Sequence, residues 1–81
     1  MKIRVKMFAM LRERGGASEV ELELPPEATV ADAISMIRGR HPGIANLLPR
    51  AATAVNLAVA DGGTVLREGD ELAVLPPVSG G

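Results

Sequence analysis

Two stretches near the start of the chain alternate strictly between apolar and charged residues. Between positions 2 and 7 three apolar residues alternate with three cations, and between positions 19 and 24 three apolar residues alternate with three glutamates. A period of two predicts β-strands that each bury one face. If the two strands form a hairpin, the cations and the glutamates share its outer face, where each opposite-charge pair contributes roughly 0.2–1 kcal/mol.

A helical period replaces this alternation after the second strand. Apolar residues then recur three or four positions apart, at Val30, Ala33, Ile34 and Ile37. This spacing predicts an amphipathic helix, which opens at Thr29 with Asp32 as its partner in a capping box and ends near Gly39. A shorter helical segment is predicted for residues 8–13, before the turn at Gly15-Gly16.

The second half of the chain has the pattern of strands joined by turns. Residues 53–60 form an apolar run that predicts a single third strand, and residues 71–75 predict the last strand. Turn residues at 61–63 and 67–70 enclose a short extended segment at 64–66.

This order of elements predicts an α+β fold, in which one main helix packs on one face of a mixed sheet. A first hairpin, a crossing helix and a last strand beside the first strand describe a β-grasp. We expect a single domain over residues 1–75, followed by an extended C-terminal tail at residues 76–81.

Composition narrows the classes of function. Apolar residues make up 47% of the 81 residues and Phe8 is the only aromatic residue, so the core must be aliphatic. The chain contains no cysteine, which excludes disulfides and thiolate metal sites. The net charge of −1 gives no attraction to nucleic acid or anionic lipid, and one aromatic side chain cannot supply the stacking that single strands require.

Two further patterns in the sequence bear on where in the cell the protein is located. No apolar run approaches the ~18 residues of a membrane span, and the first residues alternate in charge instead of forming the apolar stretch of a signal peptide. We therefore expect a cytoplasmic protein with neither nucleic acid nor a membrane as a partner.

No self-contained active site is indicated by the motifs. Gly15-Gly16 and Gly62-Gly63 lack the spacing and the lysine of a phosphate loop, so they predict turns. His41 is the only histidine, which rules out a histidine metal cluster and favours a surface-loop position. Asp70 and Glu71 fall in a turn signal, where carboxylates are normally solvated. We expect no metal and no cofactor bound by this chain, and a body that serves as a rigid carrier for its tail.

The tail consists of Pro76, Pro77, Val78, Ser79, Gly80 and Gly81. The two prolines favour an extended start, and the two glycines leave the tip without side chains. Six extended residues reach at most ~20 Å, which is enough to enter the active site of another protein. A tip without Cβ atoms fits a narrow channel and leaves a terminal carboxylate open to attack. The plain alternative is a frayed terminus.

Four stretches of the sequence carry a resemblance to a known family. They are the opening strand with Phe8-Ala9-x-Leu11-Arg12-Glu13, the helix from Thr29, the segment Ala54-Val55-Asn56, and the run from Gly69-Asp70-Glu71 through Leu75 into the tail. Together they span nearly the whole chain. They resemble the ubiquitin-like sulfur carriers, and the last stretch is the most specific because Pro-Pro-Val-Ser-Gly-Gly after Gly-Asp-Glu is typical of the small subunits of molybdopterin synthase.

The resemblance implies a carrier cycle centred on Gly81, with Gly80 keeping the tip narrow. An adenylating enzyme would use ATP to convert the Gly81 carboxylate to an acyl-adenylate, so the nucleotide site would lie on that partner. A sulfur donor system would then replace AMP and leave a thiocarboxylate. The tail would carry this sulfur into the large subunit of molybdopterin synthase, to the cyclic pyranopterin monophosphate precursor. Two deliveries would complete a dithiolene.

An exposed apolar patch is expected to dock these partners. Phe8 shares parity with the cations of the first strand, and Leu75 falls on the parity opposite Leu72 and Val74, so both are expected to point away from the core. The resemblance adds Val59 to this patch. For Phe8 the alternative is local packing against the short helix that follows it.

Two other functions stay open at this point. The chain could be a β-grasp sulfur carrier for tRNA thiolation, thiamin or cysteine synthesis, or a ubiquitin-like protein modifier. It could instead be a β-grasp interaction module whose tail is inert. The thiamin branch usually lacks the segment that corresponds to residues 10–16, which disfavours that branch.

Overall fold

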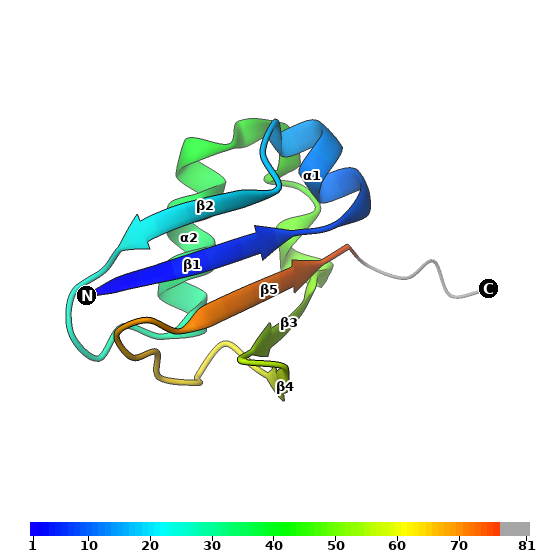
Figure 1. Ribbon diagram of the computed structural model, residues 1–81. Helices are drawn as coiled ribbons and strands as arrows, with labels where there is room; N and C mark the ends of the chain where they lie inside the picture. The colour runs from blue at the N-terminus through cyan, green and yellow to red at the C-terminus, as the bar shows by residue number, and fades with distance from the viewer. Residues whose placement is uncertain (77–81) are drawn as a thin grey trace.

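A five-stranded sheet crossed on one face by a helix forms the body of the protein (Figure 1). This computed structural model describes residues 1–76. In chain order its elements are β1 Lys2–Met7, α1 Ala9–Gly15, β2 Glu19–Glu23, α2 Val30–Arg40, the 3₁₀ turns η1 Pro42–Ile44 and η2 Leu48–Arg50, β3 Ala52–Val55, β4 Ala58–Ala60 and β5 Glu71–Leu75. The predicted division into a domain and a tail stays a prediction, because the tail beyond Pro76 lies outside the described residues.

The first and last strands lie side by side at the centre of the sheet. The strand order is β2-β1-β5-β3-β4. Strand β1 pairs antiparallel with β2 and parallel with β5, and β3 pairs antiparallel with both β5 and β4. Parallel neighbours need a crossover connection, and α2 lies in that connection, across one face of the sheet (Figure 1). The predicted α+β fold, a β-grasp with a mixed sheet and one main helix, is confirmed.

The core between α2 and the sheet is aliphatic, as the composition predicts. Strand β1 buries all three of its alternating apolar residues and α2 buries Val30, Ala33 and Ile37. Among the described residues no polar or charged side chain is buried. Each fully buried aliphatic side chain contributes roughly 1.5–3 kcal/mol, so this layer of contacts stabilises the fold without any buried polar network.

Both helices have the predicted caps. The Thr29 hydroxyl accepts a hydrogen bond from the Asp32 N–H at 3.3 Å, and the Asp32 carboxylate accepts one from the Thr29 N–H at 2.8 Å. This is the predicted capping box at the start of α2. Helix α1 ends at Gly16, whose φ of 77° is left-handed and whose N–H donates to the Arg12 carbonyl at 3.1 Å.

The predicted single strand at residues 53–60 is wrong, because the chain turns back inside it to form β3 and β4. The turn residues Asn56 and Leu57 have φ of 48° and 71°, which is the conformation of a two-residue type I′ hairpin loop. The Asn56 side chain fixes this turn: its amide donates to the Asp70 carboxylate at 2.9 Å, and its oxygen accepts from the Glu71 N–H at 3.0 Å.

Because of this two-residue turn, residues 55 and 59 do not lie on the same face of the sheet, as they would in one continuous strand. Val55 packs against the core, whereas Val59 is exposed and lies opposite Ala54 on the other face of the sheet. The predicted extended segment at residues 64–66 is reduced to one bridge between Thr29 and Val65. Within residues 1–76 no helix has the length and apolar character needed to cross a membrane.

Candidate functional site

The tail is attached to the central strand of the sheet. Strand β5 is paired on both sides, and Leu75 at its end lies opposite Ala52 of β3. Pro76, the last described residue, is half-buried. The predicted tail residues Pro77, Val78, Ser79, Gly80 and Gly81 lie outside the described residues. Because β5 is held by two neighbours, the body fixes the position and direction from which the tail starts.

Phe8 and Leu75 lie at the same level on the face of the sheet that α2 does not cover. Phe8 continues β1 in an extended conformation, with φ of −121° and ψ of 156°. The parallel register pairs Lys6 with Ala73, so two residues further along Phe8 comes level with Leu75. The two residues are 42% and 39% exposed. The structure therefore brings together these two predicted docking residues beside the start of the tail.

Val59 lies on the same face, further towards the edge. It is 95% exposed and opposite Ala54, which itself pairs with Ala73 of β5. We call Phe8, Leu75 and Val59, with Ala54 and Ala73 between them, the apolar patch. Exposed large apolar side chains gathered on one face are typical of an interface. The docking role of the patch stays a prediction.

The rest of this face is charged and internally paired. Lys2 lies 4.0 Å from Glu21, and Arg4 lies 3.8 Å from Glu19. The Glu71 carboxylate of β5 forms ion pairs with Arg4 at 3.8 Å and with Lys6 at 3.4 Å. The hairpin register places Lys2 opposite Glu23 and Arg4 opposite Glu21, so these ion pairs with β2 run diagonally across the hairpin. The cations of β1 are thus occupied by carboxylates of the same sheet.

Leu57 is the most exposed apolar residue that sequence reasoning missed, and Met10 and Val65 are also exposed. Leu57 is 92% exposed at the tip of the β3–β4 hairpin. Asn56 before it was the available signal, because asparagine is favoured at the first position of a type I′ turn. The second position favours glycine, and here it is occupied by leucine.

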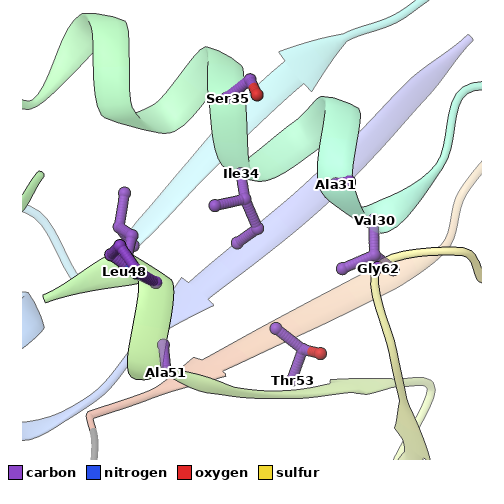
Figure 2. Close-up of a pocket in the computed structure, with 9 residues that line it drawn as sticks. Val30, Ala31, Ile34, Ser35, Leu48, Ala51, Thr53 and Gly62 are labelled. Atoms are coloured by element: carbon purple, nitrogen blue, oxygen red, sulfur yellow. The ribbon is translucent and has the colours of Figure 1, made fainter.

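A groove of about 320 Å³ lies on the other side of the sheet, between α2 and β3 (Figure 2). Ile34 reaches into it from α2 and Thr53 from β3 (Figure 2). Its remaining lining is small or apolar: Val30, Ala31, Ser35, Leu48, Pro49, Ala51 and Gly62. The Thr53 hydroxyl donates to the Ala60 carbonyl at 2.8 Å. The groove holds no titratable side chain, so it offers no acid, base or metal ligand.

The other residues considered for chemistry have structural partners. His41 is half-buried, and its Nδ1 lies 3.1 Å from the Gly15 carbonyl, so it joins the end of α2 to α1 instead of standing free in a loop. The Asp70 carboxylate accepts from the Arg67 N–H at 2.8 Å and from Asn56. Across residues 1–76 no three histidine, aspartate or glutamate side chains are grouped to hold a metal ion.

Comparisons with known proteins place this chain in a family. Residues 5–81 match the ThiS family. The molybdopterin synthase sulfur carrier subunit of Chlamydomonas reinhardtii is 34% identical to this chain, with all of both chains covered. The subunit of the same name from Homo sapiens is 34% identical over 99% of this chain and 94% of its own.

A further relative has a different name. Small archaeal modifier protein 1 of Haloferax volcanii is 36% identical over 94% of this chain and 97% of its own. The crystal structure of this modifier covers 100% of both chains with a TM-score of 0.88 at 32% identity. The resemblance that the strand and tail motifs indicate is confirmed, and the family includes proteins named as carriers and as modifiers.

Proposed function

This chain belongs to the ThiS family, and from that premise we propose that it is the sulfur carrier subunit of a molybdopterin synthase. The observation that carries the proposal is the run from Gly69-Asp70-Glu71 through β5 into Pro-Pro-Val-Ser-Gly-Gly. This run leads from the central strand β5 directly into residues 76–81, and the end of β5 lies beside the apolar patch. The two relatives named as molybdopterin synthase sulfur carrier subunits support the same assignment.

The chemistry begins at the Gly81 carboxylate. A carboxylate is a poor acyl donor, so the adenylating enzyme uses ATP to form the Gly81 acyl-adenylate and releases pyrophosphate. A sulfur donor system then displaces AMP, and the product is a C-terminal thiocarboxylate. Its sulfur attacks the cyclic pyranopterin monophosphate precursor inside the large synthase subunit and forms a thioester to Gly81. Water then hydrolyses this thioester, which leaves the sulfur on the precursor and regenerates the Gly81 carboxylate. A dithiolene holds two sulfurs, so two carriers deliver one sulfur each.

The body of the chain positions and presents the tail. In this proposal, activation and transfer take place in the sites of the partners. The apolar patch docks the adenylating enzyme and the large subunit in turn, because both must receive the same tail. Strand β5 ends beside this patch, so the chain leaves the body next to the surface that docks the partners.

A second candidate function is protein modification. It is favoured by the 36% identity to small archaeal modifier protein 1. The same acyl-adenylate can pass its acyl group to a lysine amine of a target protein, which forms an isopeptide bond. Only the acceptor differs between the two functions, and that acceptor lies outside this chain.

Intact-mass measurement of the full chain tests the proposal. Incubation with the adenylating enzyme, ATP and sulfide should add the mass of one oxygen-to-sulfur exchange, and the large subunit with precursor should then yield a dithiolene. Gly81→Ala should slow both steps strongly, because its Cβ lies next to the reacting carbonyl carbon. Gly80→Ala should have a milder effect through the fit of the tip.

Two further variants complete the test. One added residue after Gly81 should abolish both steps by moving the carboxylate, and full activity without trimming would reject the carrier function. Deletion of Gly80-Gly81 should abolish transfer and leave the free energy of unfolding within ~0.5 kcal/mol, as for other surface changes. Isopeptide products in place of dithiolene would identify the modifier function.

A further inference from the structure

Positive charge gathers at one end of the molecule. Five of the nine lysines and arginines lie on α1, on the last turn of α2 and on η2, and they are Arg12, Arg14, Arg38, Arg40 and Arg50. All five are exposed. Glu13 is the only acidic residue in the two segments 9–16 and 36–51. We call these five residues the arginine pole.

The packing of the turns joins these segments into one surface. The His41 ring contacts the Gly15 carbonyl at 3.1 Å, and η1 packs against both α1 and α2. Turn η2 then leads into β3, whose first residue Ala52 lies opposite Leu75. Figure 1 shows α1 and the ends of β1 and β5 at the same end of the sheet. Within the arginine pole, α1 with Arg12 and Arg14 packs against β5, and η2 with Arg50 leads to the residue opposite Leu75. Arg38 and Arg40 extend the pole along the end of α2.

The charge of the pole is not compensated locally. Ion pairs within 4.0 Å among residues 1–76 involve only the three cations of β1. The overall charge of −1 conceals this separation, since the acidic residues lie mainly on the β1–β2 hairpin and on the loops at the other end. A partner that approaches the tail thus meets a positive surface, although the molecule as a whole is slightly negative.

Helix dipoles explain part of the pattern. Arg12, Arg14, Arg38 and Arg40 all lie in the last turn of a helix, where cations stabilise the exposed carbonyls. Arg50 extends the same charge to the 3₁₀ turn nearest the tail, where there is no long helix to stabilise. A purely structural role predicts that loss of the arginines lowers stability and leaves binding unchanged.

We propose that the arginine pole docks against carboxylates around the site of the large synthase subunit that receives the tail. This inference rests on the proposed function and names a second contact surface beside the apolar patch. Complementary charge raises the rate of association and makes it sensitive to salt, whereas apolar contacts mainly slow dissociation. A carrier that must bind successive partners benefits from fast association, because it can bind each partner quickly and still dissociate to reach the next one.

An acidic protein surface fits the pole better than a nucleic acid does. Phe8 is the only aromatic residue and lies on the sheet face, so bases would find no stacking partners beside the arginines. The glutamates of β2 would repel a phosphate backbone that extended beyond the pole.

Stopped-flow association with the large subunit tests this proposal, using the full-length carrier. Arg40→Gln with Arg50→Gln removes two charges from the pole. The matched control is Lys2→Gln with Arg67→Gln, which removes two charges at the other end, where the Gly69 N–H donates to the Lys2 carbonyl. At low salt the pole variant should associate roughly tenfold more slowly than the control. At about 0.5 M salt the two rates should converge, because the charges are screened.

Four outcomes would overturn the proposal. Equal association rates for the pole and control variants, with sulfur transfer intact, would reject the pole while the proposed function stands. A lower melting temperature for the pole variant with unchanged association would assign the arginines to helix stabilisation alone. Binding of a single-stranded RNA oligonucleotide that only the pole variant loses, without an effect on the large subunit, would make the pole a nucleic-acid site. If the unaltered carrier fails to bind the large subunit, the proposed function and the pole both fall.

Discussion

Single residues with a left-handed backbone set the turns of this chain. Gly16 and Gly69 have φ of 77° and 82° and Asn56 and Leu57 also have positive φ. The glycine turns could be predicted from the sequence, because Gly15-Gly16 and Arg67-Glu68-Gly69-Asp70 are turn signals in their own right. At Asn56 the sequence holds only half of a type I′ signal, because leucine follows the asparagine. The hydrogen bonds that fix this turn reach Asp70 and Glu71, which are neighbours only in the folded sheet.

Gly39 and Gly69 offer a matched pair of glycine substitutions. A Cβ added at either position would have open space around it, so the backbone alone decides the result. Gly39 lies inside α2, and Gly39→Ala should stabilise the fold by about 0.5–1 kcal/mol. Gly69→Ala should destabilise it by about 1 kcal/mol, because its φ of 82° is unfavourable for alanine.

Urea unfolding of both variants measures this difference. The slope of the free energy of unfolding against urea should stay constant, so that the shift in midpoint reports stability. A stabilising Gly69→Ala would show that position 69 does not keep its left-handed conformation in solution.

At the scale of elements, strands could be predicted where apolar residues alternate with charged ones. The first hairpin and the last strand follow from alternating residues, and the capping box at Thr29 marks the start of α2. Residues 53–60 contain no charged residue, glycine or proline, and Asn56 is their only turn-favouring residue. A buried strand and a tight hairpin then give nearly the same sequence pattern.

The β3–β4 hairpin provides the second prediction. Leu57 is 92% exposed and has φ of 71°, which is unfavourable for a residue with a large side chain. Leu57→Gly should stabilise the fold by about 0.5–1 kcal/mol by supplying the asparagine-glycine pair that a type I′ turn favours. Leu57→Ala is the control, because it removes the exposed apolar atoms but retains the Cβ.

Thermal unfolding of the two variants separates these effects. Only the glycine variant should gain stability if backbone strain at position 57 is the cause. Equal gains in both variants would assign the effect to the exposed side chain, and a loss in the glycine variant would contradict the strained turn.

At the scale of the whole molecule, the two faces of the sheet carry different kinds of residues. Helix α2 covers one face (Figure 1), which holds the core. The other face carries the paired charges of the hairpin and the apolar patch. The sequence predicted that Phe8 and Leu75 point away from the core, because the parity of each strand fixes its faces. It could not predict that the parallel register places them level beside the start of the tail, since this depends on the pairing of β1 with β5.

The last prediction concerns this apolar patch. Phe8→Asp and Leu75→Glu each place a charge where the large subunit is expected to bury an apolar group, so each should weaken binding at least roughly tenfold, or ~1.4 kcal/mol. Val65→Asp is the control, because Val65 is 52% exposed and pairs with Thr29 at the start of α2, away from the tail. All three changes are at exposed positions, and their melting temperatures should stay close to that of the unaltered chain. Titration calorimetry with the large subunit gives the affinities. Unchanged affinity for both patch variants would reject the patch as the docking surface, and an equal loss for Val65→Asp would show that any added charge weakens the complex.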